Sequence, residues 1–314
     1  MSEKIFKIFI DGKSGTTGLR LYDRLQDRAD ISLITLSEEA RRDTEARRAA
    51  LCSADIAFLC LPDAAAIEAV SLIENPDTVV LDTSTAHRTD PAWAYGFPEL
   101  SPAFEEKIRT AKRIAVPGCH AGGFIALVFP LIEAGILPKD ARLSCTSLTG
   151  YSGGGKKMIE EYEGAQRSPL LSSPRQYGIA QTHKHLPEMK AVTGLETPPL
   201  FLPIVADFYS GMEVTVPLFA SQLCGGANIE DIRSVYRKKY DGAIVRYPEN
   251  ADEGGFLAAN LLSGKDGMQI GVFGNAERIL LVARYDNLGK GASGAALECM
   301  NIVCGLDKCT GLQL

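Results

Sequence analysis

The sequence predicts an α/β protein in two parts, a doubly wound parallel sheet followed by an α+β domain of mostly antiparallel sheet. Short apolar runs alternate with helical patterns up to residue 82, which is the rhythm of strands and crossover helices in a parallel sheet. Beyond residue 200, apolar and polar residues alternate as in half-buried antiparallel strands. A length of 314 residues is enough for about two domains.

The elements follow in order along the chain. In the first part we predict strands at residues 5–10, 31–36, 55–61 and 78–82, with helices over 19–25 and 63–73. In the second part we predict strands at 142–148, 212–220 and 277–285, with helices over 124–133, 229–240 and 292–303.

A glycine-rich turn separates the first strand from the first helix. Gly12, Gly15 and Gly18 give the spacing GxxGxxG instead of the commoner GxGxxG. The physical requirements of a Rossmann-like dinucleotide site are still met: a tight turn, open backbone, and a helix N-terminus aimed at a pyrophosphate. Glycines that only cap the helix are the alternative. We therefore predict cofactor contacts from Gly12, Lys13, Ser14, Gly15, Thr16, Thr17 and Gly18.

The second strand ends at Ser37, where NAD-binding proteins usually place an acidic residue for the ribose 2′-hydroxyl. Two glutamates follow at once, but Lys13, Arg41 and Arg42 are basic residues in the same region. This combination favours a 2′-phosphate, and hence NADP, with Ser37 beside it. The alternative for the two arginines is a solvated helix face.

After residue 82 the regular alternation stops, and residues 84–100 form an irregular polar segment that contains Trp93, the one tryptophan of the chain. Loops at the carboxyl ends of parallel strands surround ligands. Arg88 is therefore a candidate for binding an anionic substrate, or else the arginine of a surface loop that pairs with Asp90.

Cys119 lies between a short β-branched run and the helix predicted over 124–133, directly after Pro117 and Gly118. Free N–H groups and the macrodipole at a helix N-terminus favour a thiolate, so the position suits a nucleophile. The alternative is a small buried residue in a tight turn.

Two later segments carry further candidates. Residues 149–157, with Ser152 and Gly153, are rich in glycine and end in two lysines, so they form either an anion-binding nest or a flexible connector. Residues 177–188 begin at Tyr177 and hold His183 and His185, which share one face of an extended segment. A general acid/base explains these histidines better than a metal site, since no third ligand is nearby; a structural role is the alternative.

We expect the helix over 292–303 to return to the first domain, which leaves the second as an insertion. The predicted domains are residues 1–116 with 288–314 for NADP binding, and residues 117–287 for substrate binding and oligomerisation. Asn287 would then line the nicotinamide, unless this segment is a plain loop.

Composition excludes several classes of function. The net charge of −6 and the lack of a basic stripe argue against nucleic acid as a partner. Eight cysteines without a CxxC pair indicate neither a zinc site nor a disulfide framework. With no signal segment and no apolar run long enough to span a bilayer, we predict no membrane partner and a cytoplasmic location.

Together these blocks resemble the N-acetyl-γ-glutamyl-phosphate reductases of arginine biosynthesis, in their shorter bacterial form. The resemblance covers nearly the whole chain and is most specific at residues 183–188 and at Asp286-Asn287-Leu288 with Lys290-Gly291. The glycine turn and the cysteine are shared with aspartate-semialdehyde dehydrogenase, but that enzyme usually has Asn after the cysteine, where this chain has His120.

The resemblance implies a fold like that of glyceraldehyde-phosphate and aspartate-semialdehyde dehydrogenases. It implies NADPH-dependent reduction of an acyl phosphate to the semialdehyde, by a homo-oligomer that is most simply a tetramer. The family's nucleophile falls on Cys119 and its acid/base on His183, with His185 as the second choice. We predict substrate contacts from Arg88, Ser152, Gly153 and Tyr177.

Other functions remain open at this point. Within the same class, the substrate could be aspartyl phosphate or the longer acyl phosphate of acetylated aminoadipate. From other classes, the chain could be a cofactor-binding redox sensor or a thiol hydrolase that uses Cys119 and His183.

Overall fold

A computed structural model describes residues 5–314, so the first four residues of the predicted 1–116 segment lie outside the description. The chain forms two compact units. One comprises Met1–Pro117 with Ala295–Gly311, and the other comprises Gly118–Gly294 with Leu312–Leu314.

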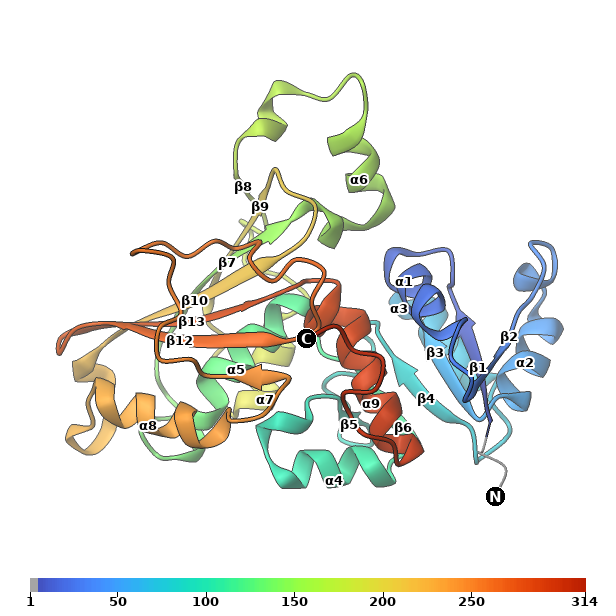
Figure 1. The fold of residues 1–314 in the computed structure, drawn as a ribbon, viewed down its shortest axis with the longest axis horizontal. Helices are drawn as coiled ribbons and strands as arrows, with labels where there is room; N and C mark the ends of the chain where they lie inside the picture. The colour runs from blue at the N-terminus through green and yellow to red at the C-terminus, as the bar shows by residue number, and fades with distance from the viewer. Residues whose placement is uncertain (1–4) are drawn as a thin grey trace. The chain divides into compact units, whose positions relative to one another are not determined.

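The first unit contains a six-stranded parallel sheet in the order β2-β1-β3-β4-β6-β5 (Figure 1). The predicted doubly wound sheet is therefore confirmed. Its strands are β1 (Phe6–Asp11), β2 (Ile31–Ile34), β3 (Ile56–Leu59), β4 (Val79–Asp82), β5 (Ala94–Tyr95) and β6 (Arg113–Ala115). Its helices are α1 (Thr16–Leu25), α2 (Thr44–Ser53), α3 (Asp63–Ser71), α4 (Pro102–Thr110) and α9 (Gly294–Cys304).

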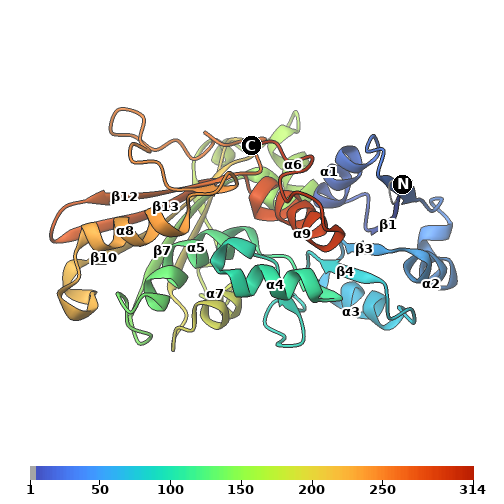
Figure 2. The same ribbon diagram turned by 60° about the horizontal axis from the view of Figure 1, so that its bottom comes forward.

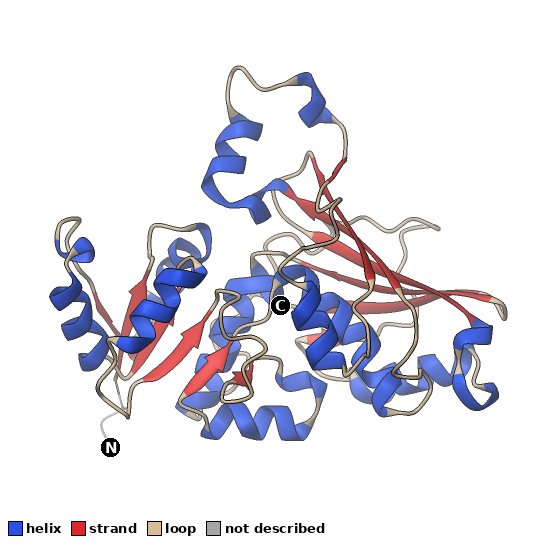
Figure 3. Cartoon of the chain, turned by 180° about the vertical axis from the view of Figure 1, so that it is seen from behind, coloured by secondary structure: helices blue, strands red, loops and turns tan. Residues whose placement is uncertain are grey.

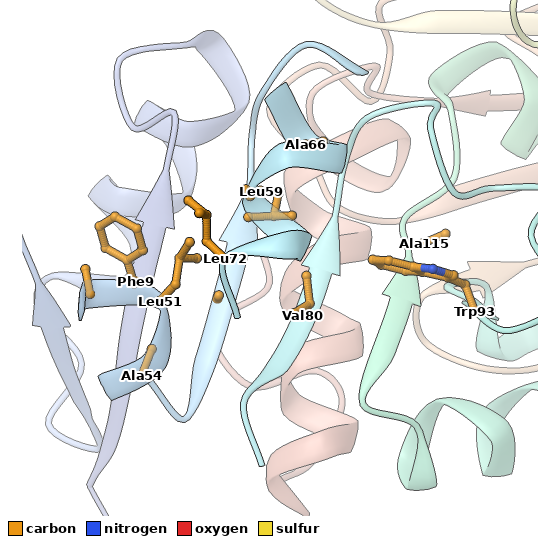
Figure 4. Close-up of a cluster of buried hydrophobic side chains, with 12 residues drawn as sticks. Phe9, Leu51, Ala54, Leu59, Ala66, Leu72, Val80, Trp93 and Ala115 are labelled. Atoms are coloured by element: carbon orange, nitrogen blue, oxygen red, sulfur yellow. The ribbon is translucent and has the colours of Figure 1, made fainter. Parts of the chain in front are cut away.

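Both faces of this sheet are covered, which explains why β3 is apolar throughout. In Figure 2, α1 and α3 lie on opposite sides of the strands. Leu51 of α2 and Ala66 of α3 are fully buried against Leu59 and Val80 (Figure 4). Each fully buried leucine contributes about 1.5–3 kcal/mol, so this cluster fixes the strands whose carboxyl ends carry the glycine turn and the polar loop.

The second unit contains a seven-stranded mixed sheet in the order β11-β12-β13-β10-β7-β9-β8. Figure 3 draws the strands of both sheets in red. The central pairs β12–β13, β13–β10 and β10–β7 are antiparallel, as predicted for this part. Its strands are β7 (Ser144–Gly150), β8 (Arg175–Gln176), β9 (Leu200–Ala206), β10 (Met212–Phe219), β11 (Val245–Arg246), β12 (Met268–Gly274) and β13 (Arg278–Tyr285). Its helices are α5 (Cys119–Glu133), α6 (Gly155–Glu163), α7 (Leu186–Thr193) and α8 (Ile229–Lys239), with a π-helical turn at Gly289–Ser293.

The two faces of this sheet differ. Helix α5 packs on β10 and β13, and α7 and α8 flank it on the same side (Figure 1). Along β10 the buried residues Val214 and Val216 alternate with Thr215 and the exposed Pro217, because successive side chains point to opposite faces. The helix side therefore holds the core, and α5 starts against that core.

Within residues 5–314, no helix is long and apolar enough to cross a membrane. The same residues contain no group of three or more His, Cys, Asp or Glu side chains arranged to hold a metal ion.

Candidate active site

The glycine turn of the first unit borders a cavity of about 400 Å³. Gly12, Lys13 and Ser14 line it beside residues 33–36 from the end of β2, with Glu38, Arg41 and Arg42. Helix α1 begins at Thr16, three residues before the predicted start, with Gly15 as its N-cap. Since the first N–H groups of a helix have no partner within the helix, they are available to a phosphate here.

Two of the three glycines have no room for a side chain. Gly12 has a φ of +86°, and a Cβ there would lie 2.2 Å from the Cys60 carbonyl oxygen. A Cβ on Gly18 would lie 2.4 Å from the Gly12 oxygen. Gly15 is under less constraint, with its closest neighbour at 3.4 Å. This turn is therefore a backbone cradle of the kind that a dinucleotide pyrophosphate needs, and the residues present fit that group.

The charged residues around this cavity are partly paired. Arg41 forms an ion pair with Glu38, and the Lys13 ammonium lies 3.0 Å from the centroid of the Tyr22 ring. Ser37 does not line the cavity; its hydroxyl donates to Glu39 at 3.1 Å and accepts from the Ala40 N–H. Ser37 therefore organises the turn after β2, and the basic groups at the cavity come from Lys13, Arg41 and Arg42.

The loop after β4 is held by buried polar contacts within the first unit. Asp82 accepts from the Ser84 N–H at 2.9 Å and lies 2.6 Å from Nδ1 of His87, whose ring stacks on Trp93. Arg88 is 8% exposed, and its guanidinium donates to the main-chain oxygens of Val116 and Thr83. These two contacts of Arg88 tie the loop to the end of β6, and its contact with a substrate stays a prediction.

Cys119 is the first residue of α5, and its side chain is half-buried. Two side chains, those of Glu188 and Tyr285, hold this turn. The Gly118 N–H donates to the buried carboxylate of Glu188 at 2.8 Å, and the Tyr285 hydroxyl donates to the Cys119 carbonyl while it accepts from the Gly123 N–H at 3.0 Å. A Cβ on Gly291 would lie 3.0 Å from Cys119 Cβ, so the π-helical turn passes directly beside the cysteine.

Four aromatic rings gather next to this turn. The ring centroid of His120 lies 5.8 Å from His183 and 5.6 Å from His185, and that of Tyr177 lies 6.0 Å from His183. The second unit thus brings the sequence-predicted residues Tyr177, His183 and His185 together around the residue that follows Cys119.

His183 and His185 differ in burial. His183 is partly exposed, and its Nδ1 accepts from the His185 N–H at 3.2 Å, which leaves Nε2 to carry the proton of the neutral ring. Burial, and then the charge of Lys184, lower the pKa of His183 below its ordinary value of 6.5. His185 is 5% exposed at the N-cap of α7. Of the two, His183 is better placed to exchange a proton with a ligand.

Ser152, Gly153 and Asn287 also lie close together in the second unit. The Asn287 amide donates to the Ser152 hydroxyl at 2.9 Å, and its oxygen accepts from the Gly211 N–H at 2.9 Å. A Cβ on Gly153 would be in ordinary contact with this amide, at 3.5 Å. Asn287 is 2% exposed, and these contacts fix the loop after β7. The approach of Asn287 to a nicotinamide stays a prediction.

Three residues at the Cys119 turn were not predicted as site residues: His120, Glu188 and Tyr285. Glu188 is the third residue of α7 and is 1% exposed. A buried carboxylate needs a specific partner, so an acidic residue between apolar neighbours in this block was a usable signal. For Tyr285 no local pattern exists, because 166 residues separate it from Cys119.

Comparison with known proteins agrees with this division of the chain. Residues 7–110 match the family model described as semialdehyde dehydrogenase, NAD binding domain, and residues 119–287 match semialdehyde dehydrogenase, dimerisation domain. Among solved structures, aspartate semialdehyde dehydrogenase II from Vibrio cholerae has a TM-score of 0.73 at 17% identity and covers 96% of this chain and 99% of its own. That likeness confirms the predicted two-part fold.

Curated relatives are much closer in sequence. N-acetyl-gamma-glutamyl-phosphate reductase 2 of Nostoc sp. is 44% identical over 98% of this chain and 99% of its own length. The Brucella ovis protein named N-acetyl-gamma-glutamyl-phosphate reductase is 45% identical over 95% of this chain and 99% of its own. On these relationships and the two family-model matches, the chain belongs to the N-acetyl-gamma-glutamyl-phosphate reductase family of semialdehyde dehydrogenases.

Proposed function

We propose that this chain reduces N-acetyl-γ-glutamyl phosphate to N-acetyl-L-glutamate 5-semialdehyde with release of phosphate, as a step of arginine biosynthesis. The observation that carries the proposal is the position of Cys119 at the first residue of a helix. The next residue, His120, has its ring among those of His183 and Tyr177, and the relatives of this chain are named for this reaction.

The chain's own residues supply acyl transfer. The Cys119 sulfur attacks the acyl carbon, the bond from that carbon to the phosphate oxygen breaks, and a thioester forms. Phosphate leaves as a stable anion and takes up the proton that the Cys119 thiol gives up. We assign Nε2–H of His183 to donate a hydrogen bond to the Cys119 sulfur, which favours the attacking thiolate.

The cofactor is NADPH, held by the cradle of Gly12 to Gly18 with Lys13, Arg41 and Arg42 at the cavity. Bound there, it supplies the hydride that reduces the thioester. The preference for NADPH rests on the cationic side chains beyond β2, where Ser37 replaces the acidic residue typical of NAD sites. Residues 1–116 with 288–314 are the part that we assign to cofactor binding.

We also propose a homo-oligomer, most simply a tetramer, that works in the cytoplasm, where its eight thiols stay reduced. The sheet face opposite α5 supports self-association, because Leu200, Phe219 and Leu280 expose 65%, 62% and 41% of their surface there. The family model matched by residues 119–287 is itself described as a dimerisation domain.

The reverse reaction tests the function. We expect NADP⁺ reduction by N-acetylglutamate semialdehyde only when inorganic phosphate or arsenate is present, and at least 100-fold lower kcat/KM with aspartate semialdehyde or the acetylated aminoadipate homologue. Phosphate-independent reduction would contradict the acyl-phosphate reaction. A preference for either alternative aldehyde would transfer the assignment to that substrate.

A further inference from the structure

The imidazole next to the cysteine makes two short hydrogen bonds that the reaction above does not use. Nδ1 of His120 lies 2.6 Å from the Ser147 hydroxyl on β7, and Nε2 lies 2.7 Å from the Tyr177 hydroxyl after β8. His120 is 3% exposed and Ser147 is fully buried. Ser147, His120 and Tyr177 thus form a chain of hydrogen bonds, with His120, in the first turn of α5, at its centre.

The imidazole in the middle of this chain is neutral. Burial lowers the pKa of His120 to about 3, and the nearby charge of His183 acts in the same direction. A neutral imidazole has one N–H donor and one acceptor nitrogen. The hydrogen bonds to Ser147 and Tyr177 therefore point the same way along the chain.

The burial of Ser147 decides that direction. In residues 5–314 the structure gives the Ser147 hydroxyl no partner other than His120. If Nδ1–H donated to Ser147, the serine hydrogen would be buried without an acceptor, at a cost of about 1–3 kcal/mol. Ser147 therefore donates to Nδ1, and Nε2–H donates to the Tyr177 oxygen.

This direction leaves the phenol hydrogen of Tyr177 pointing away from His120. No other acceptor for it is found in the described part of the chain. Burial, together with the nearby sulfur of Cys119, raises the pKa of Tyr177, so the phenol keeps its proton and acts as a donor. Its ring is placed by a main-chain bond from Tyr177 N–H to Pro203 at 3.0 Å and by the small core around Tyr162 and Leu171.

Building on the proposed function, we propose that Tyr177 donates a hydrogen bond to the acyl oxygen as negative charge develops on it during attack by Cys119, and that His120 and Ser147 are positioning residues that hold the phenol in this orientation. No proton is transferred along the chain, because His120 stays neutral throughout. His183 keeps its separate role as the hydrogen-bond donor to the Cys119 sulfur.

The loss of one preorganised oxyanion donor typically lowers kcat by about 100- to 1000-fold. We expect Tyr177→Phe to lower kcat of the full-length enzyme about 100-fold with less than threefold change in KM. Ser147→Ala lowers kcat by a smaller factor, about 5- to 10-fold, because the phenol remains but its orientation is no longer fixed. The double variant should be no slower than Tyr177→Phe, because Ser147 acts only through the phenol.

Two measurements separate this role from a general structural one. Alkylation of Cys119 by iodoacetamide does not pass through an oxyanion. The rate of alkylation and its pH dependence should therefore be equal in wild type and Tyr177→Phe. The control is Tyr151→Phe, which removes another phenol from the same small core, one that donates to Glu163 at 3.1 Å. It should match wild type in turnover, and all variants are compared by thermal unfolding.

Turnover of Tyr177→Phe within twofold of wild type would overturn the inference. So would a double variant whose loss equals the product of the two single losses, or an alkylation rate that falls with turnover. The proposed function fails separately, and is recognised by a wild-type enzyme that does not couple NADP⁺ reduction to phosphate.

Discussion

Removal of the Tyr285 hydroxyl isolates the turn that carries Cys119 from the rest of the fold. This buried phenol donates to the Cys119 carbonyl and accepts from the Gly123 N–H at 3.0 Å. In Tyr285→Phe both main-chain groups lose a partner while the ring keeps its packing. At about 0.5–1.5 kcal/mol for each hydrogen bond, we expect a loss of about 1–3 kcal/mol in the free energy of unfolding.

The matched control removes a phenol that bonds to the main chain of the same helix, α5, at a different place. Tyr240 donates to the Ala126 carbonyl of α5 at 2.7 Å and is 2% exposed. Tyr240→Phe should cost about 0.5–1.5 kcal/mol, or roughly 2–4 °C in Tm for each kcal/mol, without an effect on turnover. Tyr285→Phe should in addition lower kcat about 10-fold, because the sulfur moves with the helix start.

Urea unfolding and the reverse assay, run on both variants, check this reasoning. A Tyr285→Phe enzyme with wild-type turnover would refute the idea that this hydroxyl positions Cys119. Equal losses of turnover in the two variants would show that α5 matters as a whole and that its first turn has no special role.

Three further predictions concern charge, backbone and cofactor. Burial lowers the pKa of His120 in the folded protein to about 3, whereas the pKa is about 6.5 in the unfolded chain. On acidification the unfolded chain therefore takes up the His120 proton first. The free energy of unfolding accordingly falls as the pH drops from about 6.5 toward 3. From pH 6.5 to pH 5, urea unfolding should therefore show wild type losing about 1.5 kcal/mol more than His120→Gln, and equal losses would contradict a buried neutral ring. Gly12→Ala adds a Cβ that collides with the Cys60 carbonyl, so the affinity for NADPH, measured by fluorescence titration, should fall more than 10-fold. The control is Gly135→Ala, at a φ of +71° with open space around it, which should leave the NADPH affinity unchanged. Arg42→Ala should raise KM for NADPH about 10-fold and leave KM for NADH within twofold, and a parallel rise in both would argue against a 2′-phosphate contact.

The sequence predicted the elements whose stability comes from local patterns. The runs at β1, β3 and β4 and the helix α8 were placed within two residues, because burial imposes a period on them. The end of α5 was also placed correctly, but the helix begins at Cys119, five residues before the predicted start. Helix α2 was missed because its exposed face is rich in charge and alanine, so it shows little periodicity. Helix α1 begins earlier than predicted because threonines at residues 16 and 17 follow a glycine N-cap and continue the turn.

For the candidate site, the sequence suggested reacting groups but not the contacts that support them. Cys119 and His183 stand in short, unusual stretches that singled them out, and their roles, like that of Tyr177, stay predictions. The contacts that hold these residues come from distant parts of the chain, as with Ser147 on β7 and Tyr285 on β13. Such pairings are set by sheet register, which no local pattern specifies.

The central claim is that an acyl group is carried on the sulfur of Cys119, and mass spectrometry of the trapped protein and its peptides tests it most directly. Purified chain is mixed with N-acetyl-γ-glutamyl phosphate in the absence of NADPH, quenched in acid, and digested. We predict one N-acetylglutamyl group per chain, on the peptide that contains Cys119, released by hydroxylamine and absent from Cys119→Ala, which also loses all turnover. An acyl group on another residue, or turnover retained in Cys119→Ala, would contradict the account.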